Sequence, residues 1–560
     1  MRRAGLLFLA MCMSVVFAFA DKLPKNIEKA RGSVASVITY KQGVMLHNGV
    51  AVFAGDNGDL LSSRSLFVGA DSAVVIDSKG VARPVKYIVG VNEIFDCIKF
   101  RVNADKKIKP IASSSLPVVV DETLYLLGYG VGKGGFVEQA AVERVDSVYS
   151  CAYYTLKKPM ETRLLFLPLV NAKGELVAMM QEAATGDTIN SYAIGVSVST
   201  MLDAKAINFG KGYFPSMGIR TALPDSKEEA LSCLYMQTLV GDSISYRNVI
   251  DDFITAYPDS HEGYASRAEY ESLTLRDMNA AERSWDKAIK LATNAAEVHF
   301  GKAKSLNTIL LTGDSLSHHM LSFENVLAEY DKAIAIDNQP LYINAKAEAL
   351  CVHGRFNEAA KCYEALATTD MRGPEIFAQA SMCYKELGDY EKSVAMLDSA
   401  VNCFGSDAVK ASAPYILTRA LVYATAGKYR NAVFDYNKYE ELIGGPLGAE
   451  FYYLRVQAEL SAKMYQQALN DIDTAIDLAP NNVAYYIEKG LLCYRVNLAD
   501  EGIRVMTAAK ELAPELPDIH YLLGRLYMLK GDNGAARPCI EKAMQLGHPA
   551  AEATLLQIGN

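Results

Sequence analysis

The chain has 560 residues, of which 50% are hydrophobic, and its 56 Lys and Arg against 65 Asp and Glu give a formal net charge of −9 at pH 7. This length allows more than one domain. The acidic balance disfavours nucleic acid and anionic membrane as partners, because both repel a negatively charged surface.

The N-terminal segment, residues 1–20, is organised like a secretory signal peptide. Residues 1–3 read Met-Arg-Arg, residues 6–17 are apolar, and residues 18–20 read Ala-Phe-Ala, a small-residue cleavage site. The apolar run is too short to span a bilayer comfortably, and the rest of the chain has no uninterrupted apolar run of about 18 residues. We therefore expect an exported protein whose mature chain begins near Asp21 and which has no transmembrane segment.

Segments with alternating Val, Ile and Leu predict β-strands over residues 21–205, and glycine and proline within residues 206–225 predict a linker. Several of these segments resemble, in the same order, motifs of HtrA-like serine proteases of the trypsin fold. They are residues 48–53, 61–67, 95–100, 123–130, 163–171, 173–177 and 192–196. The resemblance implies a trypsin-like double β-barrel.

The same resemblance assigns positions to the catalytic triad. Asp96 retains the triad acid, Ser65 stands where the histidine is expected, and Leu165 stands where the serine nucleophile is expected. A leucine side chain has no lone pair and no removable proton, so it cannot attack a carbonyl carbon. The glycines that shape the oxyanion hole are replaced by Arg163, Phe166 and Leu167. We therefore expect no catalytic residues, and a pseudoprotease in which the position-165 side chain packs among apolar neighbours rather than lying open to a cleft, because exposing all of the apolar residues 164–167 would be costly.

One alternative keeps a catalytic role for this domain. His47 is the sole histidine within residues 21–205, and it could pair with Ser62, Ser63 or Ser65 as a replacement base and nucleophile. Under this alternative the protein is an exported trypsin-like serine endopeptidase.

Helical repeats are expected over residues 226–560. Pro480 and Pro514 end two similar segments, and the distance between them along the chain equals that between Gly354 and Gly388. This shared spacing matches the helix–turn–helix period of about 34 residues that is typical of tetratricopeptide repeats, and units with alanine and tyrosine at the family's positions resemble them closely. About eight units would stack into an all-α solenoid behind the β domain, since one unit cannot bury its apolar face alone.

The resemblance to tetratricopeptide repeats also implies which side chains line the concave groove. In the last three units we select Tyr453, Gln457, Tyr494, Arg495, Tyr521 and Arg525 as candidate protein-binding residues. Aromatic and Arg side chains are enriched in protein interfaces. The Lys and Asn that clamp a carboxylate in chaperone-binding members are absent. An alternative is that some of these residues merely pack against the neighbouring helix.

Cysteine and histidine spacing indicates no metal site and no cofactor. Nine of the ten cysteines follow residue 20, and several of them fall within the expected repeats, among them Cys351, Cys362, Cys383, Cys493 and Cys539. Cysteine in a helical core behaves as a small apolar residue. His318 and His319 are adjacent, so on a helix they point in different directions.

Together these patterns favour an exported, non-catalytic scaffold that binds a protein or peptide segment in an envelope assembly. The HtrA-like resemblance points to the periplasm or the extracellular side of a Gram-negative bacterium. The exported endopeptidase remains the second hypothesis, and the oligomeric state stays open.

Overall fold

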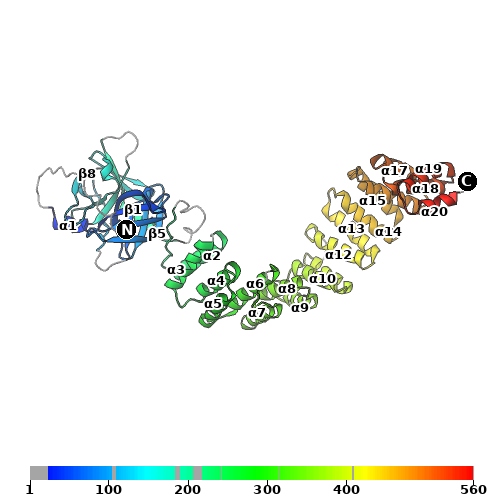
Figure 1. The fold of residues 1–560 in the computed structure, drawn as a ribbon, viewed down its shortest axis with the longest axis horizontal. Helices are drawn as coiled ribbons and strands as arrows, with labels where there is room; N and C mark the ends of the chain where they lie inside the picture. The colour runs from blue at the N-terminus through cyan, green and yellow to red at the C-terminus, as the bar shows by residue number, and fades with distance from the viewer. Residues whose placement is uncertain are drawn as a thin grey trace, which may run out of the picture. The chain divides into compact units, whose positions relative to one another are not determined.

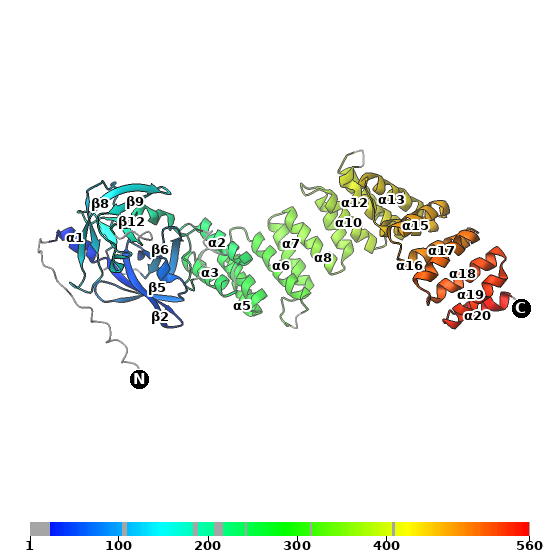
Figure 2. The same cartoon turned by 90° about the horizontal axis from the view of Figure 1, so that it is seen from above.

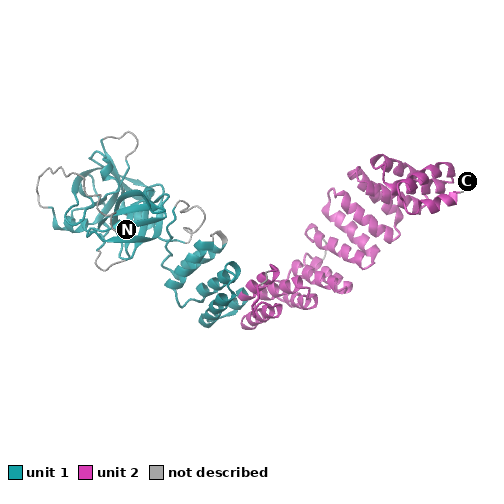
Figure 3. Ribbon diagram, in the orientation of Figure 1, with its two compact units in different colours: residues 1–301 teal, residues 302–560 magenta. Residues whose placement is uncertain are grey.

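The computed structural model describes residues 23–103, 109–182, 189–205, 217–240, 243–313, 316–405 and 409–558. The expected signal peptide and residues 206–216 of the expected linker lie outside these ranges. The chain divides into two compact units, Met1–Gly301 and Lys302–Asn560 (Figure 3).

The first unit begins with a short helix, α1 (Lys25–Arg31), and a closed barrel of six antiparallel strands (Figure 1). The barrel consists of β1 (Val34–Lys41), β2 (Val44–Phe53), β3 (Asp59–Ser63), β4 (Ser72–Ile76), β5 (Ala82–Asn92) and β6 (Cys97–Val102). Its strand order is β1-β2-β3-β6-β5-β4, and β4 closes the barrel on β1. Val37, Phe53, Leu60 and Phe100 fill its core.

A second closed barrel follows, with the order β10-β11-β12-β9-β8-β7. Its strands are β7 (Thr123–Leu127), β8 (Val137–Val148), β9 (Cys151–Leu156), β10 (Pro168–Val170), β11 (Leu176–Gln181) and β12 (Ser191–Gly195). A third apolar cluster, which includes Ile27, Leu61, Leu127 and Ile194, takes residues from α1 and both barrels. The predicted double barrel is therefore confirmed, and the two barrels share a continuous core.

The segment after residue 216 is bound to the first barrel. The Ile88 N–H of β5 donates to the Arg220 carbonyl at 2.8 Å, and the Ala222 N–H donates back to Ile88 at 2.7 Å. Helices α2 (Lys227–Val240) and α3 (Ser243–Ala256) follow. The Tyr87 hydroxyl of β5 donates to Asp252 of α3 at 2.9 Å, and Arg220 lies 3.0 Å from the same carboxylate. The described end of the expected linker is thus held between β5 and the first helix pair.

The remaining helices follow one another in antiparallel pairs (Figure 2). They are α4 (His261–Glu269), continued by a π-helical turn (Tyr270–Thr274), α5 (Met278–Leu291), α6 (Ala296–Leu311), α7 (Phe323–Ile336), α8 (Pro340–Val352), α9 (Phe356–Leu366), α10 (Pro374–Glu386), α11 (Tyr390–Asn402), α12 (Ala413–Thr425), α13 (Tyr429–Ile443), α14 (Ala449–Ser461), α15 (Tyr465–Leu478), α16 (Val483–Arg495), α17 (Ala499–Leu512), α18 (Pro517–Lys530), α19 (Asn533–Gln545) and α20 (Ala551–Ile558). The predicted helical array is confirmed. Among the described residues, α2–α19 form nine successive pairs, where about eight units were expected.

The turn within each later pair explains the period seen in the sequence. Gly354, Gly388 and Gly427 join the two helices of their pairs with φ of 72°, 74° and 72°, in the left-handed region that glycine adopts without strain. In two later pairs Lys463 and Asn497 occupy this turn with φ of 61° and 65°. The left-handed backbone conformation is therefore present in these two pairs although the turn has no glycine.

Candidate functional site

Asp96 forms a cluster with two serines at the end of β3. It lies just before β6, and the pairing of Ser63 with Cys97 across β3 and β6 brings the two segments together. Asp96 Oδ1 accepts the Ser65 N–H at 2.8 Å, and Oδ2 accepts the Ser65 hydroxyl at 2.6 Å and the Ser63 hydroxyl. Two of the expected triad positions, 65 and 96, are therefore adjacent, and Ser63 is a third member.

This cluster does not resemble a nucleophile with its base. Both serine hydroxyls donate to one carboxylate oxygen, and a carboxylate is a much weaker base than the imidazole that normally activates serine. The Ser62 hydroxyl donates to the Val50 carbonyl at 2.7 Å. His47 lies exposed on β2. The three serines considered as its partners thus donate their hydroxyl protons to other acceptors.

Position 165 lies in the turn that leads into β10. Leu164 and Leu167, with 0% and 1% of their surfaces exposed, belong to the core of the second barrel, whereas Leu165 and Phe166 are half-buried. The expectation that the position-165 side chain packs among apolar neighbours therefore holds only in part, because Leu165 is half-buried and lies outside the core that takes Leu164 and Leu167. The cause is the tight turn, in which Phe166 has φ of 61°, so four successive side chains cannot all face the same core.

Arg163 of the same turn is held at the surface by two carboxylates. It contacts Glu138, and its Nε lies 2.7 Å from Glu161. Its guanidinium also lies 5.3 Å from the centre of the Phe136 ring. A segment with these contacts differs from the glycine-rich turn that places two N–H groups around an oxyanion.

Three of the six groove candidates form one cluster in the second unit. Arg525 Nη1 donates to the Tyr521 hydroxyl at 3.2 Å, and Nη2 donates to the Tyr494 hydroxyl. The guanidinium lies 5.1 Å from the Tyr494 ring centre and 6.0 Å from that of Tyr521. His548 stacks on Tyr521 at 3.9 Å between ring centres, and Thr554 of α20 lies 3.2 Å from the Tyr521 hydroxyl. This bracing by α20 was not predicted, because α20 lies beyond the last repeat.

The other three candidates are not part of this cluster. Tyr453 is half-buried, and its ring lies 5.0 Å from that of the buried Tyr485. Gln457 and Arg495 are exposed. Tyr453 therefore packs against a neighbouring helix, as the alternative interpretation of these residues expected. Gln457 and Arg495 are exposed and available to a ligand.

The adjacent histidines lie in the irregular stretch between α6 and α7 rather than on a helix. The ring centres of His318 and His319 are 4.3 Å apart, so the expectation that the two side chains point in different directions is wrong. The helical geometry on which that expectation rested does not apply to this stretch.

A series of basic residues between the helices was not predicted from the sequence. We call the first helix of each pair helix A. In six pairs the seventh residue of helix A is basic and pairs with a carboxylate of an adjacent helix. These residues are Arg267, Lys302, Lys346, Arg419, Arg455 and Lys489. Lys489 follows Arg455 by one repeat length, so aligning the units would have revealed the position.

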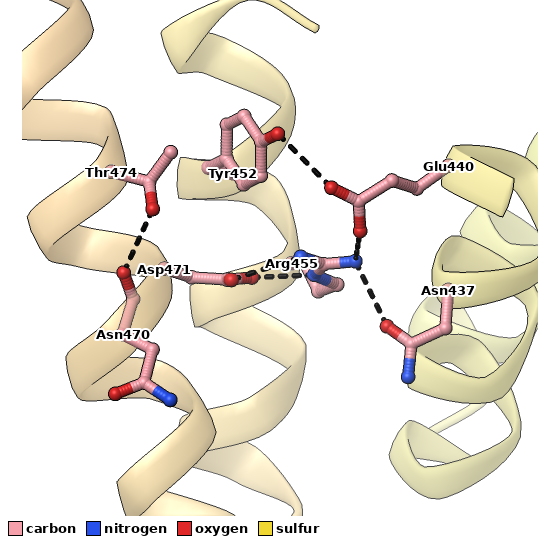
Figure 4. A network of polar contacts seen from close by, with 7 residues as sticks. All are labelled: Asn437, Glu440, Tyr452, Arg455, Asn470, Asp471 and Thr474. Carbon is pink, nitrogen blue, oxygen red and sulfur yellow. Dashed lines mark hydrogen bonds and ion pairs between the residues drawn. The ribbon is translucent and has the colours of Figure 1, made fainter. Parts of the chain in front are cut away.

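Arg455 shows how these residues connect neighbouring pairs (Figure 4). Its guanidinium donates to both oxygens of Asp471 on α15, at 2.5 and 2.9 Å, and to Glu440 and Asn437 on α13, at 2.5 and 2.9 Å. Only 6% of Arg455 is exposed, and such a bidentate pair fixes the geometry of both helices. These contacts engage every nitrogen of the guanidinium and stabilise the array.

Glu459, one turn further along α14, is 2% exposed, and its Oε2 has no hydrogen-bond partner among the described residues. Burial, reinforced by the negative charge of Asp471, raises the pKa of Glu459 to about 8. This carboxyl is therefore protonated at neutral pH.

Comparisons with known proteins match the two halves of the chain separately. A family model described as the second ARM domain of tetratricopeptide repeat protein 21 matches residues 317–558. Superkiller complex protein 3 of Homo sapiens is 23% identical over 353 residues, and that of Mus musculus is 24% identical over 318 residues. The matches cover 57% and 53% of this chain but only 21% and 19% of the relatives, so the chain spans about a fifth of their length.

Similar solved structures include HtrA-like proteases. The serine endoprotease from Yersinia pestis has a TM-score of 0.29 at 16% identity, covering 33% of this chain and 66% of that one. The HtrA-type protease AlgW with tripeptide has a TM-score of 0.28 at 18% identity, covering 31% and 60%. The first unit of this chain contains two closed six-stranded barrels, and the helical part is a tetratricopeptide- or ARM-like repeat. Within the described ranges, no helix combines the length and apolar character needed to cross a bilayer.

Proposed function

We propose that this protein is a non-catalytic binding scaffold, in which a barrel domain without a peptidase site is joined to a helical array that holds a protein segment. The observation that carries the proposal is the Asp96 cluster. The group at the position of the base is Ser65, whose hydroxyl donates to Asp96 at 2.6 Å, and position 165 carries a leucine. A serine hydroxyl that donates to a carboxylate does not act as the general base of a triad, and a leucine side chain cannot attack a carbonyl carbon.

The helical array supplies the binding function. Arrays of stacked helix pairs present long concave surfaces, and the cluster of Tyr494, Tyr521 and Arg525 is built from residue types that dominate protein interfaces. The name of the relative Superkiller complex protein 3 describes a component of a complex, which agrees with a scaffold role.

Labelling with a fluorophosphonate tests the proposal directly. The purified chain should show no more label than a heat-denatured sample, and it should not hydrolyse casein. The double variant Leu165→Ser/Ser65→His should remain close to inactive, because Arg163, Phe166 and Leu167 still replace the glycines of the oxyanion turn. Specific labelling of any serine in the wild-type chain would instead establish the endopeptidase hypothesis.

We also propose that the protein acts in the periplasm or at the extracellular side of a Gram-negative bacterium, after removal of residues 1–20. The support is the basic, apolar and Ala-Phe-Ala succession of those residues. Protein purified from an envelope fraction should begin at Asp21 by N-terminal sequencing. A retained Met1 in that fraction would contradict cleavage.

A further inference from the structure

Two thiols from successive repeats meet inside the second unit. Cys351 lies near the end of α8 and Cys383 lies on α10, and their sulfur atoms are 3.3 Å apart. Cys351 is partly exposed, whereas Cys383 is fully buried. A disulfide has a sulfur–sulfur bond of about 2.05 Å, so the two atoms need to approach by only about 1.3 Å.

The contact between the Cys351 and Cys383 sulfur atoms lies beside a packed apolar core. Cys383 belongs to an apolar cluster with Tyr363, Leu350 and Ala380, and Cys351 packs against it. Tyr363 is 1% exposed and lies in this cluster beside the two thiols. Because interiors are close-packed, the two sulfurs stay in contact rather than meet by chance.

We propose that Cys351 and Cys383 form a modification site, an intramolecular disulfide made by exchange with a small-molecule or protein disulfide. The partly exposed Cys351 thiolate attacks the oxidant's disulfide, forms a mixed disulfide and releases one reduced thiol. The Cys383 thiolate then attacks the Cys351 sulfur, breaks the mixed disulfide and releases the second reduced thiol. Two protein thiols are oxidised and one disulfide is reduced to two thiols, which take up the two cysteine protons.

The burial of Cys383 fits this order of events. Burial, and then its contact with Cys351, raises the pKa of the Cys383 thiol, so this sulfur reacts slowly with reagents in solution. Once Cys351 carries the mixed disulfide, the neighbouring Cys383 attacks within the molecule, where its proximity replaces a bimolecular encounter.

The product would join two A helices around the whole of α9. The cross-link encloses residues 351–383 and limits the freedom of this stretch in the unfolded chain. Met382, next to Cys383, is 42% exposed, and Glu348 lies exposed one turn before Cys351. Oxidation would therefore fix the separation of two helices that carry exposed side chains. This inference is independent of the proposed binding function.

The chain offers a sharp test, because trypsin places the three nearby cysteines on separate peptides. Cleavage after Lys and Arg yields residues 347–355 with Cys351, 362–372 with Cys362, and 373–385 with Cys383. The full chain is incubated with oxidised glutathione, unfolded in denaturant with excess N-ethylmaleimide so that buried free thiols are also blocked, digested and analysed by mass spectrometry. We expect peptides 347–355 and 373–385 to be linked, with a mass two hydrogens below their sum.

Variants and a second measurement decide the outcome. Cys351→Ser should abolish the linked pair and leave Cys383 blocked by N-ethylmaleimide, whereas the matched control Cys403→Ser, at an exposed thiol, should retain it. The oxidised wild-type chain should melt several degrees higher than the reduced chain, as expected for a loop of this length. If Cys351→Ser does not fold, Cys383→Ala serves in its place. A stable glutathione adduct on Cys351 beside a blocked Cys383, or a Cys351–Cys362 link, would overturn the proposal.

Discussion

Two carboxyl groups of this protein have opposite hydrogen-bonding environments: Asp96 is half-buried and has several donors around it, whereas Glu459 is buried beside another acidic residue. Asp96 accepts hydrogen bonds from Ser63 and Ser65, so its charge is compensated by donors. Glu459 is buried beside Asp471 without a described partner for Oε2, so its protonated form is favoured. A single side chain thus makes the stability of the helical array depend on pH.

We predict that Glu459→Gln removes this dependence. The folded-state pKa of about 8 lies above the usual value of about 4.3, so the stability contributed by protonated Glu459 is complete below pH of about 4 and is lost as pH rises through about 8. As the pH rises from about 4 to about 8, the free energy of unfolding of the variant should increase relative to that of the wild type, by a total on the order of 5 kcal/mol.

Hydrogen exchange in α14 and α15, compared between variant and wild type at each pH, measures the effect, since the intrinsic exchange rates then cancel. Glu450→Gln, at an exposed carboxylate in the first turn of α14, is the matched control and should behave as wild type. A constant difference between Glu459→Gln and wild type from pH 4 to pH 9 would contradict the assignment.

At the scale of the helix pair, the left-handed turn between the two helices is the recurring requirement. Gly354, Gly388 and Gly427 meet it without strain, and an added Cβ at these positions would contact nothing within 4 Å. Lys463 has φ of 61° in the equivalent turn, where a side chain costs about 1 kcal/mol or more.

Lys463→Gly should therefore slow hydrogen exchange in α14 and α15 by roughly fivefold, which corresponds to about 1 kcal/mol. The reciprocal variant Gly427→Ala should accelerate exchange in α12 and α13 by a similar factor, because the backbone conformation is strained while the space around it is open. Faster exchange in Lys463→Gly would mean that the lysine side chain contributes more than its backbone strain costs.

The cluster on α16 and α18 gives a prediction for the groove. Arg525 is held between two tyrosine rings, so its cation is positioned before a ligand arrives, whereas Arg495 on α16 is exposed. Arg525→Ala should weaken capture of a bound protein segment by at least about 30-fold, as truncation of a central arginine does. Arg495→Ala should change it by less than about threefold.

The measurement is a titration of the captured partner against each immobilised variant, with circular dichroism to verify folding. Equal losses for both variants would place the ligand along the outer rim of the groove. Unchanged binding in both would move the binding surface away from α16 and α18.

On the scale of the whole molecule, the first unit contains the first helices of the array in addition to the two barrels. Residues 220–222 pair with Ile88 of β5. The Asp252 carboxylate of α3 accepts a hydrogen bond from the Tyr87 hydroxyl and forms an ion pair with Arg220. Burial raises the pKa of Asp252 against the opposing effect of Arg220, and it raises the pKa of Tyr87 to about 12. The barrel and the first helices are joined by these partly buried contacts rather than by a free connection.

Asp252→Ala should loosen this joint, because it leaves the Tyr87 hydroxyl without its acceptor, at a cost of about 1–3 kcal/mol. Hydrogen exchange should rise in residues 217–223 and in α3, and stay unchanged in α14–α19. Asp251→Ala, which removes the half-exposed partner of Arg267, is the control and should leave residues 217–223 unaffected. If residues 217–223 are equally protected from hydrogen exchange in both variants, the backbone hydrogen bonds to β5, and not Asp252, hold this segment against the barrel.

Much of this architecture was predictable because it rests on local patterns. The repeat period reflects helix length, turn and small residues, which every unit must contain to stack. The resemblance of short segments between residues 21 and 205 to HtrA-like motifs, in the same order, implied two barrels and assigned Ser65 and Asp96 to neighbouring triad positions, and the Ser65 hydroxyl donates to Asp96 in the structure.

Other features were decided only by the tertiary structure, because they depend on side chains that meet across elements. The sequence by itself determined the two architectures and the residue types at positions 65, 96 and 165. Packing decided that Ser63 shares the Asp96 oxygen, that His548 braces Tyr521, and that the Cys351 and Cys383 sulfurs touch. Such contacts depend on the angles between helices and strands, which no local pattern encodes.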